Sequence, residues 1–117
     1  MNGIDYLLDT NIIIGLLKGN AQAVNLTQGI NLSACAFSAI TRMELLGFVG
    51  ITDHEEKTVK ALLDRMTRLS LTPAIEELTI QFRRQHRAKL PDAIIAATAE
   101  AHGLELLTLD KKLQAKL

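Results

Sequence analysis

The chain is 117 residues long, a length that suits one domain with one hydrophobic core. Its 13 basic and 13 acidic residues cancel, which excludes attraction to nucleic acid by overall charge but leaves local patches open. No apolar run reaches the ~18 residues that a membrane helix needs, and the single cysteine, Cys35, cannot form an internal disulfide. We therefore expect one cytoplasmic domain over residues 1–117, with a buried thiol and no membrane partner.

Along the chain, apolar segments of strand type alternate with segments of helical spacing. We predict strands over 4–8, 32–37, 69–71 and 104–108, and helices over 12–17, 38–47, 74–87 and 91–103, with further helices opening near 52 and 110. Thr52 and Glu55 form a capping box, and Gly103 is a typical left-handed helix end. Such alternation predicts an α/β fold with a parallel sheet and helices on both faces.

Two acids follow predicted strands. Asp9 ends the first strand, and Asp110 lies two residues beyond the last. Ligands of open parallel sheets bind outside the carboxyl ends of the strands, so both acids are expected at that edge.

Two further acids lie on predicted helices. Glu44 is spaced to share one helical face with Ile40, Met43 and Gly47, and Asp92 heads the apolar stripe of an alanine-rich helix. An ionised carboxylate in a dry setting costs several kcal/mol unless it is paired or bound to a metal. Since oxygen ligands without His or Cys suit Mg²⁺ or Mn²⁺, we expect the four acids to share such a cation.

Each acid also has a local interpretation. Asp9 could cap the first helix, Asp92 could complement the dipole of its own helix, and Asp110 could start the last helix. Glu44 could complete a capping box begun by Thr41 or pair with the neighbouring arginine. It is the combination of all four that favours a shared site.

Four segments carry a family resemblance. Leu7–Asn11, Ser38–Leu45, Pro91–Ala96 and Leu106–Asp110 resemble, in order and spacing, the signature of PIN-domain ribonucleases. The size is similar to that of VapC-type toxins of bacterial toxin–antitoxin pairs. The resemblance implies a three-layer α/β/α sandwich that uses Mg²⁺ or Mn²⁺ to cleave single-stranded regions of RNA.

The resemblance also assigns roles to residues. Asp9, Glu44 and Asp92 would be the main metal ligands and Asp110 the fourth, while Thr10, Asn11 and Thr108 would orient them. Lys111 and Lys112 stand where many members have another acid, which puts a second metal in doubt. A small antitoxin, often inserting an arginine among the acids, and a homodimer are further implications.

The densest basic run lies just before Asp92 and consists of Arg83, Arg84, Arg87 and Lys89. It is either a solvated helix face or a surface that binds RNA phosphates. His54, His86 and His102 are separated in sequence and are expected to be solvated.

Two rival functions stay open. One is a phosphotransferase or phosphatase with Asp9 as nucleophile, which Asn11 disfavours because a dehalogenase-like enzyme needs an acid at that position. The other is a catalytically idle module that binds RNA or protein.

Overall fold

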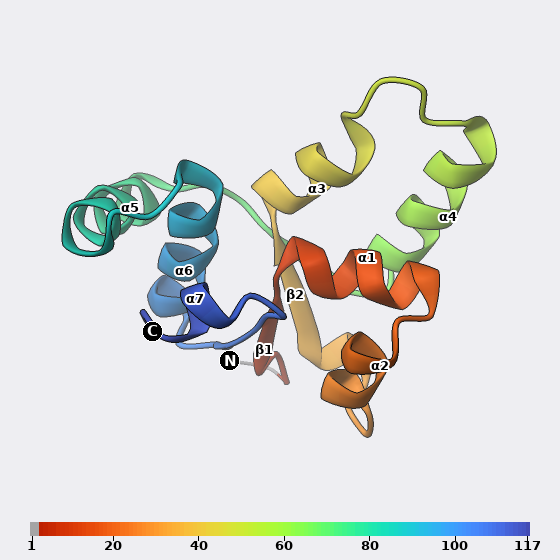
Figure 1. Cartoon of the computed structure of the whole chain (residues 1–117), viewed down its shortest axis with the longest axis horizontal. Coiled ribbons are helices and arrows are strands. Elements are labelled where there is room, and N and C mark those ends of the chain that lie inside the picture. The colour runs from red at the N-terminus through yellow and green to blue at the C-terminus, as the bar shows by residue number, and fades with distance from the viewer. Residues whose placement is uncertain (1–2) are drawn as a thin grey trace.

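The central layer of the molecule is a sheet of four parallel strands in the order β3-β2-β1-β4. The computed structural model describes residues 3–117 and confirms the predicted α/β/α sandwich (Figure 1). The strands are β1 (Tyr6–Leu8), β2 (Cys35–Ser38), β3 (Thr67–Leu69) and β4 (Glu105–Leu107). The helices are α1 (Thr10–Lys18), α2 (Ala21–Thr27), the 3-10 turn η1 (Leu32–Ala34), α3 (Ala39–Leu46), α4 (Asp53–Leu63), α5 (Pro73–His86), α6 (Leu90–His102) and α7 (Lys111–Gln114).

Successive strand residues point to opposite faces of the sheet and build two cores. Leu8 and Phe37 belong to the core beneath α1, α3 and α4, and Leu7 and Ala36 belong to the core beneath α6. Helices on both faces bury both sides of β1 and β2, which explains why these strands read as nearly continuous apolar runs.

Side chains at the helix ends fix where several helices begin and end. Thr52 and Glu55 form the predicted capping box, with hydrogen bonds of 3.1 and 3.0 Å that join each side chain to the backbone of the other. Thr72 accepts a hydrogen bond from the backbone of Ile75 at the start of α5. Gly103 ends α6 in the left-handed conformation, as predicted.

The structure differs from the sequence prediction at α2, which was not predicted. Its seven residues bury only Ala23, so the segment carries no apolar period to detect. Instead, α2 forms because it packs closely on α1: a Cβ atom at Gly15 would lie 2.5 Å from the Cβ of Ala23. The missing side chain at Gly15 is therefore what allows the two helices to approach.

The third strand was placed two residues too late. It covers Thr67–Leu69 rather than 69–71 and pairs in register with residues 36–38 of β2. Arg68 is exposed at the middle of this edge strand, so the segment lacks the apolar run that marks a buried strand. Its position is decided by pairing with β2.

The segment from Gly47 to Gly50 forms an exposed loop, with Val49 101% accessible. Cys35 is fully buried, as expected, and burial raises the pKa of its thiol. Across residues 3–117, none of the helices combines the length and the hydropathy that crossing a bilayer requires.

Candidate active site

The site is built around Asp9, which follows β1 at the carboxyl edge of the sheet. Its side chain is only 5% exposed. One carboxylate oxygen, Oδ1, accepts a hydrogen bond from the backbone N–H of Thr10 at 2.8 Å. The other, Oδ2, accepts one from the hydroxyl of Thr108 at 2.7 Å. Asp9 therefore caps α1, as its local interpretation proposed, while being held from two different chain segments.

The electrostatic surroundings of Asp9 oppose its charge. Burial raises the pKa of this carboxyl, the hydrogen bonds from Thr108 and Thr10 lower it in part, and the negative charges of Asp92 and Glu44 raise it further, leaving the pKa above its usual range. The one ion pair formed among residues 3–117 joins Lys60 to Glu56 on the surface of α4 and involves none of these acids. Three acids therefore share one region with no basic partner in contact.

Glu44 reaches the site from α3, but not from the buried face that its spacing predicted. The buried residues of α3 are Ala39, Thr41 and Leu45, whereas Glu44 is exposed and Met43 is 54% exposed. The prediction of an inward-facing Glu44 was wrong, because the buried face of α3 is the one that carries Thr41 and Leu45. Glu44 stands at the rim of the site, where its Oε1 accepts a hydrogen bond from the hydroxyl of Thr10 at 2.7 Å.

Asp92 lies in the first turn of α6 and is half-buried. The seven residues that follow it, Ala93–Ala99, are all buried, so the predicted enclosed helix is confirmed. Because α6 packs against α3, the start of this helix lies close enough for Asp92 to raise the pKa of Asp9. Asp92 therefore lies near Asp9 although it stands 83 positions later in the sequence.

Asp110 has a local partner. Its Oδ1 accepts hydrogen bonds from the backbone N–H groups of Lys112 at 2.9 Å and Leu113 at 3.2 Å, which makes it the N-cap of α7. The interpretation that Asp110 starts the last helix is thus correct. It is linked to Asp9 through Thr108, whose hydroxyl accepts from the backbone N–H of Asp110 at 3.0 Å and donates to Asp9 Oδ2 at 2.7 Å.

The orienting residues form a hydrogen-bonded network across the sheet edge. Asn11 accepts from the backbone N–H of Leu109 at 3.1 Å and donates to the hydroxyl of Thr108 at 3.4 Å. Thr108 also accepts from the backbone N–H of Asp110 at 3.0 Å. These contacts join the start of α1 to the loop after β4. They fix the position of Thr108, which in turn holds the carboxylate of Asp9.

Sequence reasoning missed one member of this network. Thr41 was considered only as a helix cap, yet its side chain is fully buried and its hydroxyl oxygen lies 2.9 Å from that of Thr10. The available signal was its position, three residues before Glu44 and therefore on a neighbouring part of the same helix surface.

The donor chemistry of the site fits a hard divalent cation. Asp9, Glu44 and Asp92 offer only carboxylate oxygens, and their mutual repulsion is the kind that a cation relieves. Within residues 3–117, however, no group of three His, Cys, Asp or Glu side chains is closed into a geometry that would hold a metal ion. The predicted quartet is therefore not a preformed cage, which is compatible with Mg²⁺ because this ion commonly takes one or two carboxylates and keeps several waters.

The predicted basic run lies where α5 turns into α6. Arg83 and Arg84 occupy the last turn of α5, Arg87 ends that helix in the left-handed conformation, and Lys89 is the N-cap residue of α6. All four are exposed. The three arginines line a shallow hollow of about 400 Å³, and Lys89 is three residues from Asp92.

Solvation of the three histidines was predicted, and the structure confirms it fully only for His54, because His86 and His102 are partly buried. His54 is exposed at the start of α4, and His102 is partly exposed at the end of α6. His86 packs against Phe82 with a ring separation of 4.5 Å.

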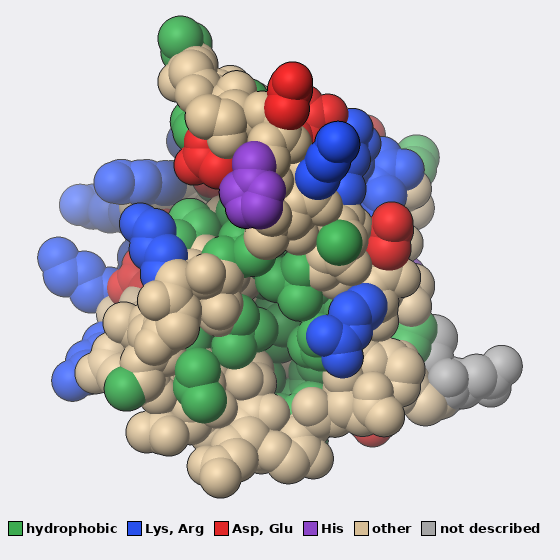
Figure 2. All heavy atoms as spheres, turned by 90° about the vertical axis from the view of Figure 1, so that its right-hand side faces the viewer, with side chains coloured by type: hydrophobic (Ala, Val, Ile, Leu, Met, Phe, Trp, Pro, Cys, Tyr) green, Lys and Arg blue, Asp and Glu red, His purple; other side chains and the backbone are tan. Residues whose placement is uncertain are grey.

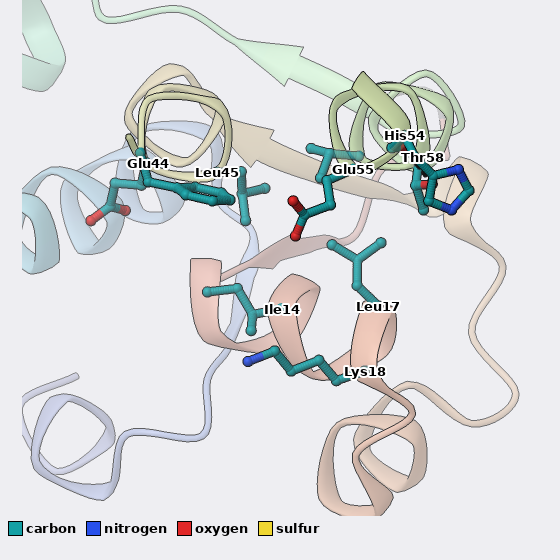
Figure 3. A pocket seen from close by; sticks show the side chains of 10 residues that line it. Ile14, Leu17, Lys18, Glu44, Leu45, His54, Glu55 and Thr58 are labelled. Carbon is teal, nitrogen blue, oxygen red and sulfur yellow. Dashed lines mark hydrogen bonds between the residues drawn. The ribbon is translucent and has the colours of Figure 1, made fainter. Parts of the chain in front are cut away.

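An apolar groove of about 570 Å³ runs between α1, α3 and α4. Hydrophobic side chains gather in a hollow near the middle of this face of the molecule (Figure 2). In Figure 3, Ile14, Leu17 and Lys18 of α1 lie across the groove from Leu45 and Glu55. Glu44 stands at one end of the groove with its carboxylate directed away from Glu55, so the groove leads to the acidic site.

Comparison with known proteins identifies relatives of the chain. A family model for the PIN domain matches residues 6–116. No curated protein sequence matches the chain.

Several solved structures share the fold. A toxin–antitoxin complex from Klebsiella pneumoniae is 35% identical, with 95% of this chain and 91% of that chain covered and a TM-score of 0.83. FitAcB from Neisseria gonorrhoeae is 25% identical, with 95% and 91% covered and a TM-score of 0.78. VapBC-1 from nontypeable Haemophilus influenzae is 24% identical, covers 97% and 92%, and shares the fold with a TM-score of 0.79.

We predict that Asp92→Asn lowers the pKa of Asp9, because it removes one of the negative charges that raise it. A raised carboxyl pKa means that the folded state binds the proton more tightly than the unfolded state. The contribution of Asp9 to the stability of the metal-free protein therefore falls as pH rises from 3.8 through the folded-state pKa, and this fall is smaller in Asp92→Asn.

Carbon-13 NMR titration of the Asp9 carboxyl and urea unfolding between pH 3.5 and about 7, both in a metal chelator, measure these effects. Asp53→Asn is the matched control, since Asp53 also lies in the first turn of a helix but does not affect the pKa of Asp9. An equal Asp9 pKa in the wild type and both variants contradicts the prediction.

Proposed function

Because the chain belongs to the PIN domain family, we propose that it is a Mg²⁺- or Mn²⁺-dependent endoribonuclease, the toxin of a toxin–antitoxin pair. PIN domains are in general nucleases. The observation that carries the proposal is the buried Asp9, whose ionisation is opposed by Asp92 and Glu44 while no basic side chain of residues 3–117 pairs with it. We further propose that residues 1–117 act as one nuclease domain in the cytoplasm.

In this proposal Asp9, Glu44 and Asp92 hold the cation, and Asp110 is a fourth ligand as the resemblance implies. When bound, the ion would supply Lewis-acid stabilisation of the phosphodiester charge and would make hydroxide available near neutral pH. The protein's own part is to keep the carboxylates oriented. Thr108 and the Thr10 backbone hold Asp9, and the Thr10 hydroxyl holds Glu44.

The phosphate backbone of RNA is proposed to lie along the exposed run of Arg83, Arg84, Arg87 and Lys89. This run surrounds the turn that leads into α6, and Asp92 lies in the first turn of that helix. Since the overall charge is zero, such a local patch is what would supply electrostatic attraction. The scarcity of aromatic side chains favours recognition of RNA shape or of a short exposed loop.

An antitoxin is the proposed protein partner. The Klebsiella pneumoniae structure, 35% identical to this chain, is a toxin–antitoxin complex. The apolar groove beside α1 offers a surface for such a partner, because Ile14 and Phe48 remain 39% and 49% exposed there and the groove leads to Glu44. A homodimer is also proposed, and sedimentation velocity of the purified protein tests it.

The phosphotransferase alternative is not favoured by the geometry. Both oxygens of Asp9 accept hydrogen bonds and the side chain is 5% exposed, which is a poor arrangement for an attacking nucleophile. The idle-module alternative predicts RNA binding without cleavage.

We expect Asp9→Asn and Asp92→Asn to reduce RNA cleavage by about 100-fold or more, the scale seen when one key electrostatic group is removed from an active site. Purified protein is incubated with structured RNAs with and without Mg²⁺ or Mn²⁺, and the cut ends are sequenced. Circular dichroism confirms that each variant is folded, and Asp53→Asn serves as an acid-to-amide control. Unchanged cleavage in both site variants, or binding of RNA without cleavage by the wild type, overturns the proposal.

For the basic run, we expect Arg84→Ala and Arg87→Ala each to weaken RNA binding across sequences and to reduce the salt dependence of log K by about 0.7 per lost contact with single-stranded RNA. Fluorescence anisotropy at several salt concentrations, in a chelator that prevents cleavage, measures the slope. Arg68→Ala, on the exposed edge strand β3, is the control. Equal slopes in all three variants show that the run is only a solvated helix face.

For the groove, we expect Ile14→Glu to weaken antitoxin binding by about 10-fold or more, because a charge would be buried against an apolar surface. The antitoxin is identified as the protein whose co-expression restores growth to cells that express this chain. Val24→Glu is the matched control, since Val24 is an aliphatic residue of α2 that is 45% exposed and lies outside the groove. Equal affinities for the two variants would place the antitoxin elsewhere.

A further inference from the structure

Thr41 is a buried polar residue to which the proposed mechanism gives no task. It lies in the first turn of α3 and is fully buried. Its hydroxyl oxygen is 2.9 Å from the hydroxyl oxygen of Thr10, across 31 positions of sequence. A buried hydroxyl is costly unless it is hydrogen-bonded, so this contact accounts for its presence in the core.

Other threonines within helices of this chain satisfy their hydroxyls differently. Four of them, Thr27, Thr58, Thr79 and Thr98, donate to the carbonyl four residues back. Thr41 cannot do so within its helix, because α3 begins only two residues earlier, at Ala39. Its hydroxyl is directed across to α1 instead, which makes it a link between two elements of the site.

The number of hydrogens on the two hydroxyls determines which of them is the donor in the Thr41–Thr10 hydrogen bond. The Thr10 hydroxyl has one hydrogen, and at 2.7 Å from Glu44 Oε1 it donates that hydrogen to a carboxylate that only accepts. The Thr10 oxygen must therefore act as acceptor toward Thr41, so Thr41 is the donor in that pair. The result is a chain of two hydrogen bonds that run from Thr41 through Thr10 to Glu44.

We propose that Thr41 is a positioning residue for the metal site. By donating to Thr10, it fixes the direction in which the Thr10 hydroxyl points and thereby holds one oxygen of the exposed Glu44 in place. Hydrogen bonds in such chains polarise one another, which strengthens the contact to the carboxylate. The inference rests on the proposed function, since it requires Glu44 to be a ligand.

The need for such support follows from where Glu44 lies. An exposed glutamate has several rotatable bonds, and ordering a side chain of this kind costs rotamer entropy. Asp9, by contrast, is held by burial and by two hydrogen bonds. The surroundings of Glu44 do not fix its orientation. The hydrogen bonds from Thr41 to Thr10 and from Thr10 to Glu44 do so, starting from a buried hydroxyl.

The test compares Thr41→Val with Thr41→Ser. Valine keeps the shape but removes the hydroxyl, and serine keeps the hydroxyl. We expect Thr41→Val to weaken Mn²⁺ binding by about 3- to 10-fold, at or below the range for groups that contact metal ligands directly, and Thr41→Ser to restore it to within about 2-fold. Isothermal titration calorimetry with Mn²⁺ and no RNA measures this affinity.

Thr98→Val is the matched control, because Thr98 is equally buried but donates to a carbonyl within its own helix. It should lower thermal stability without changing Mn²⁺ affinity. A double variant, Thr41→Val with Thr10→Val, tests the order of the chain. If Thr41 acts through Thr10, the double variant binds Mn²⁺ as weakly as Thr10→Val alone.

The outcomes separate the two proposals. A wild-type protein that neither binds Mn²⁺ nor cleaves RNA overturns the proposed function and this inference with it. A wild type that does both, together with Thr41→Val of unchanged Mn²⁺ affinity, overturns only the role of Thr41. If Thr41→Val does not fold, Thr41→Ala is compared with Thr41→Ser in the same assay, and equal affinities overturn the role in the same way.

Discussion

The arrangement of the site depends on one constraint, the burial of the Asp9 carboxylate at the end of β1. Burial and two neighbouring acids oppose its charge, whereas the hydroxyl of Thr108 and the backbone N–H of Thr10 stabilise it. A carboxylate so placed is unfavourable to the folded protein by itself, because it is buried and the charges that shift its pKa are of the same sign. Such a balance is typical of functional sites, where stability is sacrificed for a group that must meet a ligand.

The topology explains how distant segments reach this carboxylate. With β1 between β2 and β4, the residues that follow these strands meet at one edge, and the helices α3 and α6 bring Glu44 and Asp92 to it. The hydrogen bonds of Thr10, Asn11 and Thr108 then tie the start of α1 to the segment after β4 and to α3. The threonines and the asparagine are thus as much a part of the site as the acids.

Three chemically different surfaces lie around this edge, although the whole chain has no net charge. The acids lie at the sheet edge, exposed arginines cluster where α5 turns into α6, and an apolar groove runs from Glu44 between α1, α3 and α4. A nuclease toxin needs an analogous separation, since metal, phosphate backbone and protein partner are recognised by different interactions. The overall composition gives no sign of these surfaces, because their charges cancel in the total. They are seen only when the residues are placed in the structure.

The sequence by itself determined the alternation of elements, the capping box at Thr52, the end of α6 at Gly103 and the acids at strand ends, because these depend on local periodicity and local hydrogen bonds. Tertiary structure decided what local patterns leave open. It placed α2 through the close approach at Gly15, set β3 by pairing with β2, and turned Thr41 rather than Glu44 toward the core. Two stripes of α3 had comparable spacing, and the choice between them was made by the sheet and by α1, which a sequence pattern does not contain.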